Sequence, residues 1–163
     1  MREYVEKLIA EYPKMVSARD FLKKQIDEYQ PVTVEDVIDS MTFSQPSGER
    51  VQTSRISDKT CSIALHYRDR VNQMNEEVIG DWAKEYARLD EEIGFLEQCI
   101  RRLPAALYDV MKALVLDGES WDEAEAGLQI CRKTMAGRRR EAIGLMVLEY
   151  QKKASKLETL MLW

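Results

Sequence analysis

Residues 58–103 contain no proline and only two glycines, and this uninterrupted stretch restricts the possible folds more than any other feature of the chain. Its large apolar residues recur three or four positions apart, as on one side of an α-helix: Ile63, Tyr67, Val71, Met74, Val78, Trp82, Tyr86, Leu89, Ile93, Leu96, Ile100 and Leu103. Such a helix would reach roughly 65 Å at 1.5 Å per residue. We therefore predict an all-α protein with a long helical rod that begins after Ser57.

A rod of this kind cannot bury its apolar side alone. Residues 2–30 carry a second helical pattern, and Pro13 within it predicts either a kink or the start of another helix. Its apolar members are Val5, Leu8, Tyr12, Met15, Leu22, Ile26 and Tyr29. Two alternatives remain open for the rod: a helical hairpin with residues 2–30, or a coiled-coil homodimer through the long helix.

The connection between these two segments differs in composition. Thr33 is a suitable N-cap for a short helix that would extend to Met41, because Asp36 follows three positions later. Residues 42–57 hold Pro46, Gly48 and several Ser and Thr but few large apolar side chains. We predict a loop or linker over 42–57.

Charge is distributed unevenly along the chain. The net charge is −5, which by itself argues against a nucleic-acid partner. Residues 130–156, however, hold eight Lys/Arg and two Asp/Glu, a local charge of +6. Contact with phosphate depends on local charge more than on the sum for the whole molecule. The C-terminal part therefore remains a candidate for DNA binding.

The last third of the chain has the order of a helix-turn-helix. Pro104 ends the rod and suits the first turn of a new helix. A turn at Gly118 precedes a short helix that Ser120 caps, and a second turn at residues 127–130 precedes a basic helix after Cys131. We divide the chain into residues 1–103, a helical hairpin or coiled coil, and residues 104–163, a helix-turn-helix domain.

In a helix-turn-helix the second helix lies in the major groove, and its N-terminal residues reach the bases. Arg132 and Lys133 are therefore the leading candidates for base contacts, while Ala136 and Gly137 lack bulk and would allow the backbone to approach DNA closely. The predicted DNA-binding residues are Arg132, Lys133, Thr134, Ala136, Gly137, Arg138, Arg139 and Arg140, and Lys152, Lys153 and Lys156 extend the positive surface.

Residues 103–143 resemble region 4 of sigma-70-type factors, and most closely the small region-4-like regulators of phages and prophages. The matching positions are Leu103, Pro104, Gly118, Ser120, Trp121, Leu128, Ile130, Thr134, Arg138, Ala142 and Ile143. The resemblance implies a transcriptional regulator that binds double-stranded DNA and contacts RNA polymerase.

Four positions depart from the family pattern, and one of them is Met135, which replaces a valine. Ala124 replaces an isoleucine, Cys131 replaces a serine N-cap, and Glu125 stands where the family has a small alanine between the two helices. An unpaired buried carboxylate would cost several kcal/mol. We therefore expect Glu125 to be exposed, paired or protonated.

Two other functions stay open: a DNA-packaging adaptor of the small-terminase kind, and a helical interaction scaffold with a degenerate helix-turn-helix. We expect no enzyme, metal site or cofactor, since the chain lacks a phosphate-binding glycine loop, a metal-ligand cluster and a Cys–His motif. Three widely spaced cysteines indicate reduced thiols, and no apolar stretch is long enough to span a membrane, so we expect a cytoplasmic protein.

Overall fold

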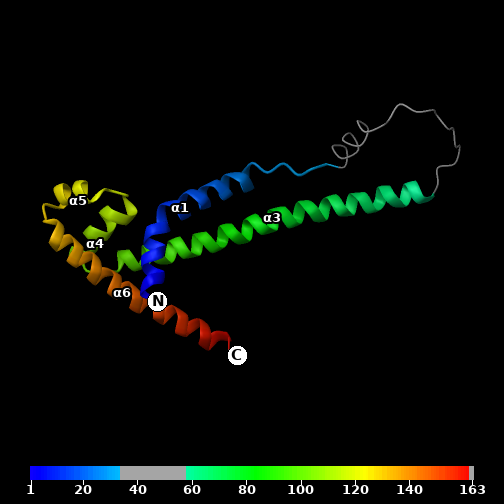
Figure 1. Cartoon of the computed structure of the whole chain (residues 1–163). Coiled ribbons are helices and arrows are strands. Elements are labelled where there is room, and N and C mark those ends of the chain that lie inside the picture. The colour runs from blue at the N-terminus through cyan, green and yellow to red at the C-terminus, as the bar shows by residue number, and fades with distance from the viewer. Residues whose placement is uncertain (34–57, 162–163) are drawn as a thin grey trace. The chain divides into compact units, whose positions relative to one another are not determined.

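The computed structural model describes residues 1–33 and 58–161, and within these ranges the chain forms helices and no strand (Figure 1). The elements are α1 (Arg2–Asp27), α3 (Asp58–Arg101), α4 (Ala105–Met111), a short π-helix η1 (Lys112–Leu116), α5 (Trp121–Leu128) and α6 (Arg132–Met161). The all-α class is confirmed. The predicted short helix after Thr33 and the predicted loop 42–57 lie outside the described residues.

Helix α3 is 44 residues long and confirms the predicted rod. Its first residue is Asp58, so the helix begins directly after Ser57, as predicted. Two members of its apolar side, Met74 and Val78, are 59% and 41% exposed. The periodic pattern therefore identifies the helix, but not every residue in the pattern is buried.

Helix α1 runs through Pro13 without interruption, so residues 2–27 form one helix and not two. Proline has no amide hydrogen, which removes one backbone bond from the helix and favours a kink. Figure 1 shows α1 bending in its N-terminal half, where Pro13 lies. One turn further on, the hydroxyl of Ser17 donates a hydrogen bond to the carbonyl of Pro13 over 2.9 Å.

The chain forms two compact units. One comprises Met1–Phe21 with Ala87–Trp163, and the other comprises Leu22–Tyr86. The boundary predicted between residues 103 and 104 falls inside the first unit. As a boundary between independently folding parts, it remains a prediction.

Helices α1, α3 and α6 supply much of the core of the first unit. The buried side chains on these helices are large and apolar: Val5, Leu8, Ile9, Tyr12, Leu89, Ile93, Leu96, Ile100, Ile143, Met146 and Tyr150. Tyr150 of α6 meets Tyr4 and Phe95 edge to face, with ring centroids 5.9 Å and 4.7 Å away. The N-terminal helix is thus part of the platform that supports α6.

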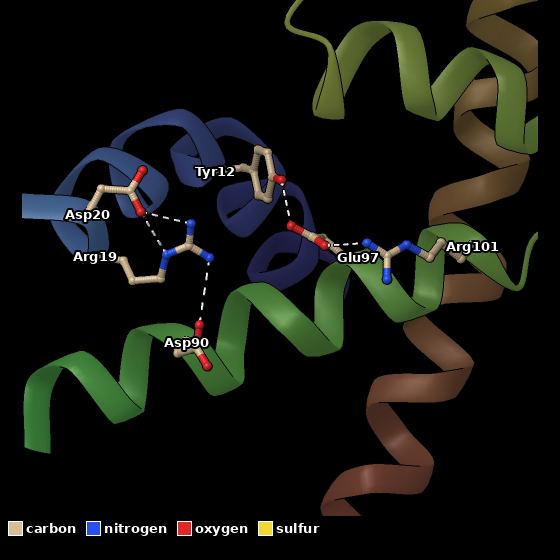
Figure 2. Close-up of polar contacts among 6 residues, drawn as sticks. All are labelled: Tyr12, Arg19, Asp20, Asp90, Glu97 and Arg101. Atoms are coloured by element: carbon tan, nitrogen blue, oxygen red, sulfur yellow. Dashed lines mark hydrogen bonds and ion pairs between the residues drawn. The ribbon is translucent and has the colours of Figure 1, made fainter. Parts of the chain in front are cut away.

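Polar contacts set the direction of α1 against α3 in this unit (Figure 2). The Tyr12 hydroxyl donates to Glu97 over 2.9 Å, and an Arg19 guanidinium nitrogen lies 3.6 Å from Asp90. The later residue of α1 therefore meets the earlier residue of α3, so the two helices run antiparallel, as a helical hairpin requires. Burial, and secondarily the bond to Glu97, raises the pKa of Tyr12 to about 12.

In the second unit, α1 and α3 meet around Asn75. The side chain of Asn75 accepts hydrogen bonds from the Tyr29 hydroxyl (2.6 Å) and the Val32 amide (3.2 Å) and donates to the Val32 carbonyl (2.9 Å). Tyr29 also packs edge to face on Trp82, with centroids 5.7 Å apart. The end of α1 is thereby fixed to α3 beyond the last turn of the helix.

Candidate nucleic-acid interface

Helix α4, together with η1, precedes α5 and α6, the two helices predicted to form the helix-turn-helix. Pro104 precedes α4 as predicted, and Leu107, Val110 and Met111 face the core. The wider π-helical turn follows, in which the Asp117 amide donates to the Lys112 carbonyl over 2.9 Å. No feature of the sequence predicted this turn. The chain then reverses at Gly118, whose φ of +69° confirms the predicted turn and favours glycine.

Helix α5 begins with a complete capping box. The Ser120 hydroxyl accepts a bond from the Glu123 amide (3.3 Å), and the Glu123 carboxylate accepts one from the Ser120 amide (2.8 Å). These two bonds satisfy amides that have no partner inside the helix. The predicted cap at Ser120 is confirmed.

The second turn is shorter than predicted. Gly127 and Leu128 are the last residues of α5, and the left-handed residue is Gln129, with φ of 55°. The prediction had extended this turn from Gly127 to Ile130. Helix α6 starts at Arg132, immediately after Cys131, as expected.

One small buried cluster holds the two helices at their crossing. Val110, Ala113, Ala124 and Met135 form it, and the half-buried side chains Leu114, Trp121, Leu128 and Ile130 pack against it. The small residue between the helices is Ala124, which is fully buried, and not the position of Glu125.

Glu125 is half-buried and has a specific partner. Its carboxylate accepts a hydrogen bond from the amide of Arg132 over 3.1 Å. That amide belongs to the first turn of α6, where backbone amides lack helical partners and a negative charge is favourable. Of the three states expected for Glu125, the structure confirms the paired one.

Helix α6 has a buried side and an outward side. Met135, Ala142, Ile143 and Met146 are buried, as predicted. Lys133, Gly137 and Arg140 are exposed and lie four and three residues apart, so they share the opposite side of the helix. Ala136 and Arg138 are half-buried between these two sides, whereas Arg139, four residues from both Met135 and Ile143, is half-buried on the buried side. A Cβ atom added at Gly137 would meet nothing within 4 Å, so no contact within the chain requires glycine there.

Helix α5 holds Arg132 at the start of α6. The Arg132 guanidinium lies 3.0 Å from the Asp122 carboxylate and 5.7 Å above the centre of the Trp121 ring. Its amide is bound to Glu125, so both its backbone and its side chain contact α5. Sequence reasoning missed this role of α5. The signal was present, because Asp122 and Glu125 are three residues apart and share one side of the helix.

The other basic residues near the start of α6 have no such partner. Within the part of the chain that the structure describes, Lys133, Arg138, Arg139 and Arg140 form no ion pair. The basic residues further along differ, since Lys152 pairs with Glu149 (2.6 Å) and Lys153 with Glu91 (2.7 Å). The uncompensated positive charge of α6 therefore lies mainly in its first nine residues, with Lys156 as an outlying member.

Cys131 and Thr134 form the N-terminal cap of α6. The Cys131 sulfur and the Thr134 hydroxyl oxygen are 3.1 Å apart, and hydrogen bonds from Thr134 lower the pKa of the Cys131 thiol. The predicted DNA contact of Thr134 thus involves a hydroxyl that already engages the cap. Cysteine takes over the role of the serine expected at this position, because sulfur also accepts from the first-turn amides.

The described helices show no arrangement suited to a metal ion, and none of them is long and apolar enough to cross a membrane. No protein-family model, curated protein or solved structure matches the chain. The arrangement of α4, α5 and α6 and the basic residues of α6 are therefore the basis for assigning a function.

Proposed function

We propose that the protein is a DNA-binding transcriptional regulator and that the start of α6 enters the major groove. The observation that carries this proposal is the set of four uncompensated basic side chains, Lys133 and Arg138–Arg140, near the start of the second helix of a helix-turn-helix. Charges without protein partners are available to phosphates, and their binding releases counterions from DNA. The resemblance to sigma region 4 supports a regulatory role and makes RNA polymerase the expected protein partner.

The outward side of α6 has the shape that groove insertion needs. The major groove accepts a single helix whose N-terminal turns lie near the base edges. Lys133 and Arg140 flank Gly137 on that side, so a cation stands one turn before and one turn after a position without a side chain. This arrangement favours a close approach of the backbone with a phosphate or base contact at each end.

The packing at the helix crossing argues against the scaffold alternative. Glu125 was the main reason to regard the helix-turn-helix as degenerate. In the fold it binds the first amide of α6 while Ala124 fills the space between the helices. The crossing is therefore well packed, and a functional DNA-binding motif is the simpler interpretation.

A matched pair of charge variants tests the proposal. Lys133→Ala/Arg140→Ala removes two uncompensated charges, whereas Lys84→Ala/Lys153→Ala removes two charges that carboxylates already neutralise. By fluorescence anisotropy on duplexes selected from a random-sequence pool, we expect the first variant to weaken binding about thirtyfold. For this variant, the slope of log K against log salt concentration should become less negative by roughly two, since each lost phosphate contact removes about one.

The second variant should bind DNA within about threefold of the parent. Circular dichroism controls for folding, because Lys153 also lies 4.5 Å above the Phe95 ring and contributes to packing. Equal losses in the two variants, or a parent protein that does not bind duplex DNA, would contradict the proposal.

A further inference from the structure

A second exposed surface of α6 lies beside the proposed DNA-binding side. Leu145 and Leu148 are 38% and 52% exposed, although the helix buries its other large apolar residues nearby. Both line a groove between the end of α3 and the middle of α6 that also includes Leu103. The groove is further lined by the charged residues Arg102, Glu149 and Lys152. Isolated exposed leucines are common, but three that share one groove form a surface suited to a partner.

The spacing along α6 indicates a helix as that partner. Glu141, Leu145, Leu148 and Lys152 are four, three and four residues apart, and all are exposed. This is the repeat with which one helix packs along another. The stripe therefore fits a helix of the same repeat better than a loop or a strand edge.

The order of charges within the stripe identifies the partner helix. When two copies of α6 lie antiparallel about a two-fold axis between residues 146 and 147, Leu145 of one copy faces Leu148 of the other. The same operation places Glu141 of each copy opposite Lys152 of the other. The two Leu145–Leu148 layers are then flanked at each end by one Glu141–Lys152 ion pair between the copies. An isologous interface requires such self-complementarity, because the same surface is present on both copies.

The carboxylate needed for this pairing is available. Within the described residues, Glu141 has no ion-pair partner, whereas Glu149 is shared by Lys152 (2.6 Å) and Arg102 (4.0 Å). Lys152 has three donor hydrogens, so it can bind Glu141 of a second copy while keeping Glu149. The new contact would extend the existing pairs into a network across the interface.

We propose that the protein forms an antiparallel homodimer through the stripe Glu141–Leu145–Leu148–Lys152 of α6. This contact differs from a coiled coil along α3, and the dimer itself does not depend on DNA binding. The stripe lies about a quarter turn around α6 from Lys133, Gly137 and Arg140. The two-fold axis therefore leaves both DNA-binding sides on the same face of the dimer.

A consequence for DNA rests on the proposed function. Between the two copies, the Gly137 positions would be about 30 Å apart, from 1.5 Å of rise per residue and the lateral distance between packed helices. Successive major grooves on one side of DNA are about 34 Å apart. The dimer would therefore recognise two inverted half-sites separated by about one helical turn.

Sedimentation velocity of the full chain without DNA, over a concentration series, tests the dimer separately from DNA binding. We expect Glu141→Lys to raise the dimer Kd about tenfold, because two attractive pairs become repulsive. Glu141→Lys/Lys152→Glu should return the Kd to within about threefold of the parent. Glu119→Lys, the same charge change at an exposed position away from the stripe, should leave it unaltered.

Leu148→Glu should abolish the dimer, and circular dichroism should show unchanged helicity because Leu148 is largely exposed. A parent that sediments only as a monomer overturns the inference. It is also overturned by a dimer that survives Glu141→Lys and Leu148→Glu, or by one that Met74→Glu in α3 dissociates instead. If the protein forms no dimer but Lys133→Ala/Arg140→Ala still weakens DNA binding more than its control double variant does, the dimer is refuted and the proposed DNA binding stands.

Discussion

The two basic segments of α6 have similar composition and opposite surroundings. Near the start, Lys133 and Arg138–Arg140 face no carboxylate among the described residues, whereas Lys152 and Lys153 are each within 2.7 Å of one. Basic residues near the start of α6 are therefore available to bind an external anion, whereas those further along pair with carboxylates and stabilise the fold. Positive charge along a helix indicates a nucleic-acid surface only where the tertiary structure leaves that charge uncompensated.

The cysteines that lie near these two segments provide the largest expected difference. Cys131 caps the start of α6, and its thiol pKa is lowered by Thr134. Cys99 lies in the groove beside the middle of α6, and burial followed by the charge of Glu149 raises its pKa to about 11. At pH 8 the thiolate fraction of Cys99 is therefore about 10⁻³, so Cys131 should react with iodoacetamide more than about a hundredfold faster.

Mass spectrometry of the separated peptides measures both rates in one experiment. The Cys131 rate should approach its plateau at a lower pH than that of an unperturbed thiol, while the Cys99 rate should still rise tenfold per pH unit above pH 8. Unfolding in urea should bring the two rates together. Similar reaction rates for Cys131 and Cys99 in the folded protein would contradict the predicted difference between their surroundings.

Gly137→Ala tests how closely the start of α6 approaches DNA. The added methyl group meets nothing within the chain, so helix propensity should stabilise the protein by about 1 kcal/mol. If the backbone lies against DNA, the same methyl group should weaken duplex binding by roughly tenfold. Gly144→Ala is the matched control, because its Cβ also meets nothing and lies two turns further along the same side.

For Gly137→Ala, thermal unfolding and fluorescence anisotropy should therefore give opposite signs: a more stable protein that binds DNA less tightly. Gly144→Ala should give the same stabilisation and a smaller loss of affinity. Equal affinities for the parent and Gly137→Ala would show that this part of the helix does not approach the duplex.

Asp122→Asn gives the smallest expected change and tests the one compensated charge at the start of α6. Releasing Arg132 from Asp122 should strengthen binding to non-specific duplex about threefold, since exposed ion pairs contribute roughly 0.2–1 kcal/mol. Asp109→Asn removes an equal charge from the exposed surface of α4 and serves as the control. Isothermal titration on a random duplex measures both. Equal gains would assign the effect to net charge and not to Arg132.

Local signals predicted the elements around the candidate site well. Pro104, Gly118 and Ser120 each act within one turn of the chain, and each occupies the position that its backbone chemistry predicted. The start of α6 after Cys131 followed from the same rules. The start of the second turn was predicted two residues too early, because the left-handed C-cap of α5 is Gln129 and not a glycine.

The sequence by itself determined the helices, the buried side of α6 and the location of its basic residues, because periodicity, capping and composition act over short distances along the chain. The tertiary structure decided that Ala124 fills the helix crossing, that Glu125 and Asp122 hold Arg132, and that the distant carboxylate of Glu91 neutralises Lys153. These pairings join side chains whose distance in space has no counterpart in their spacing along the sequence. Glu91 and Lys153, for example, are 62 positions apart and 2.7 Å from each other.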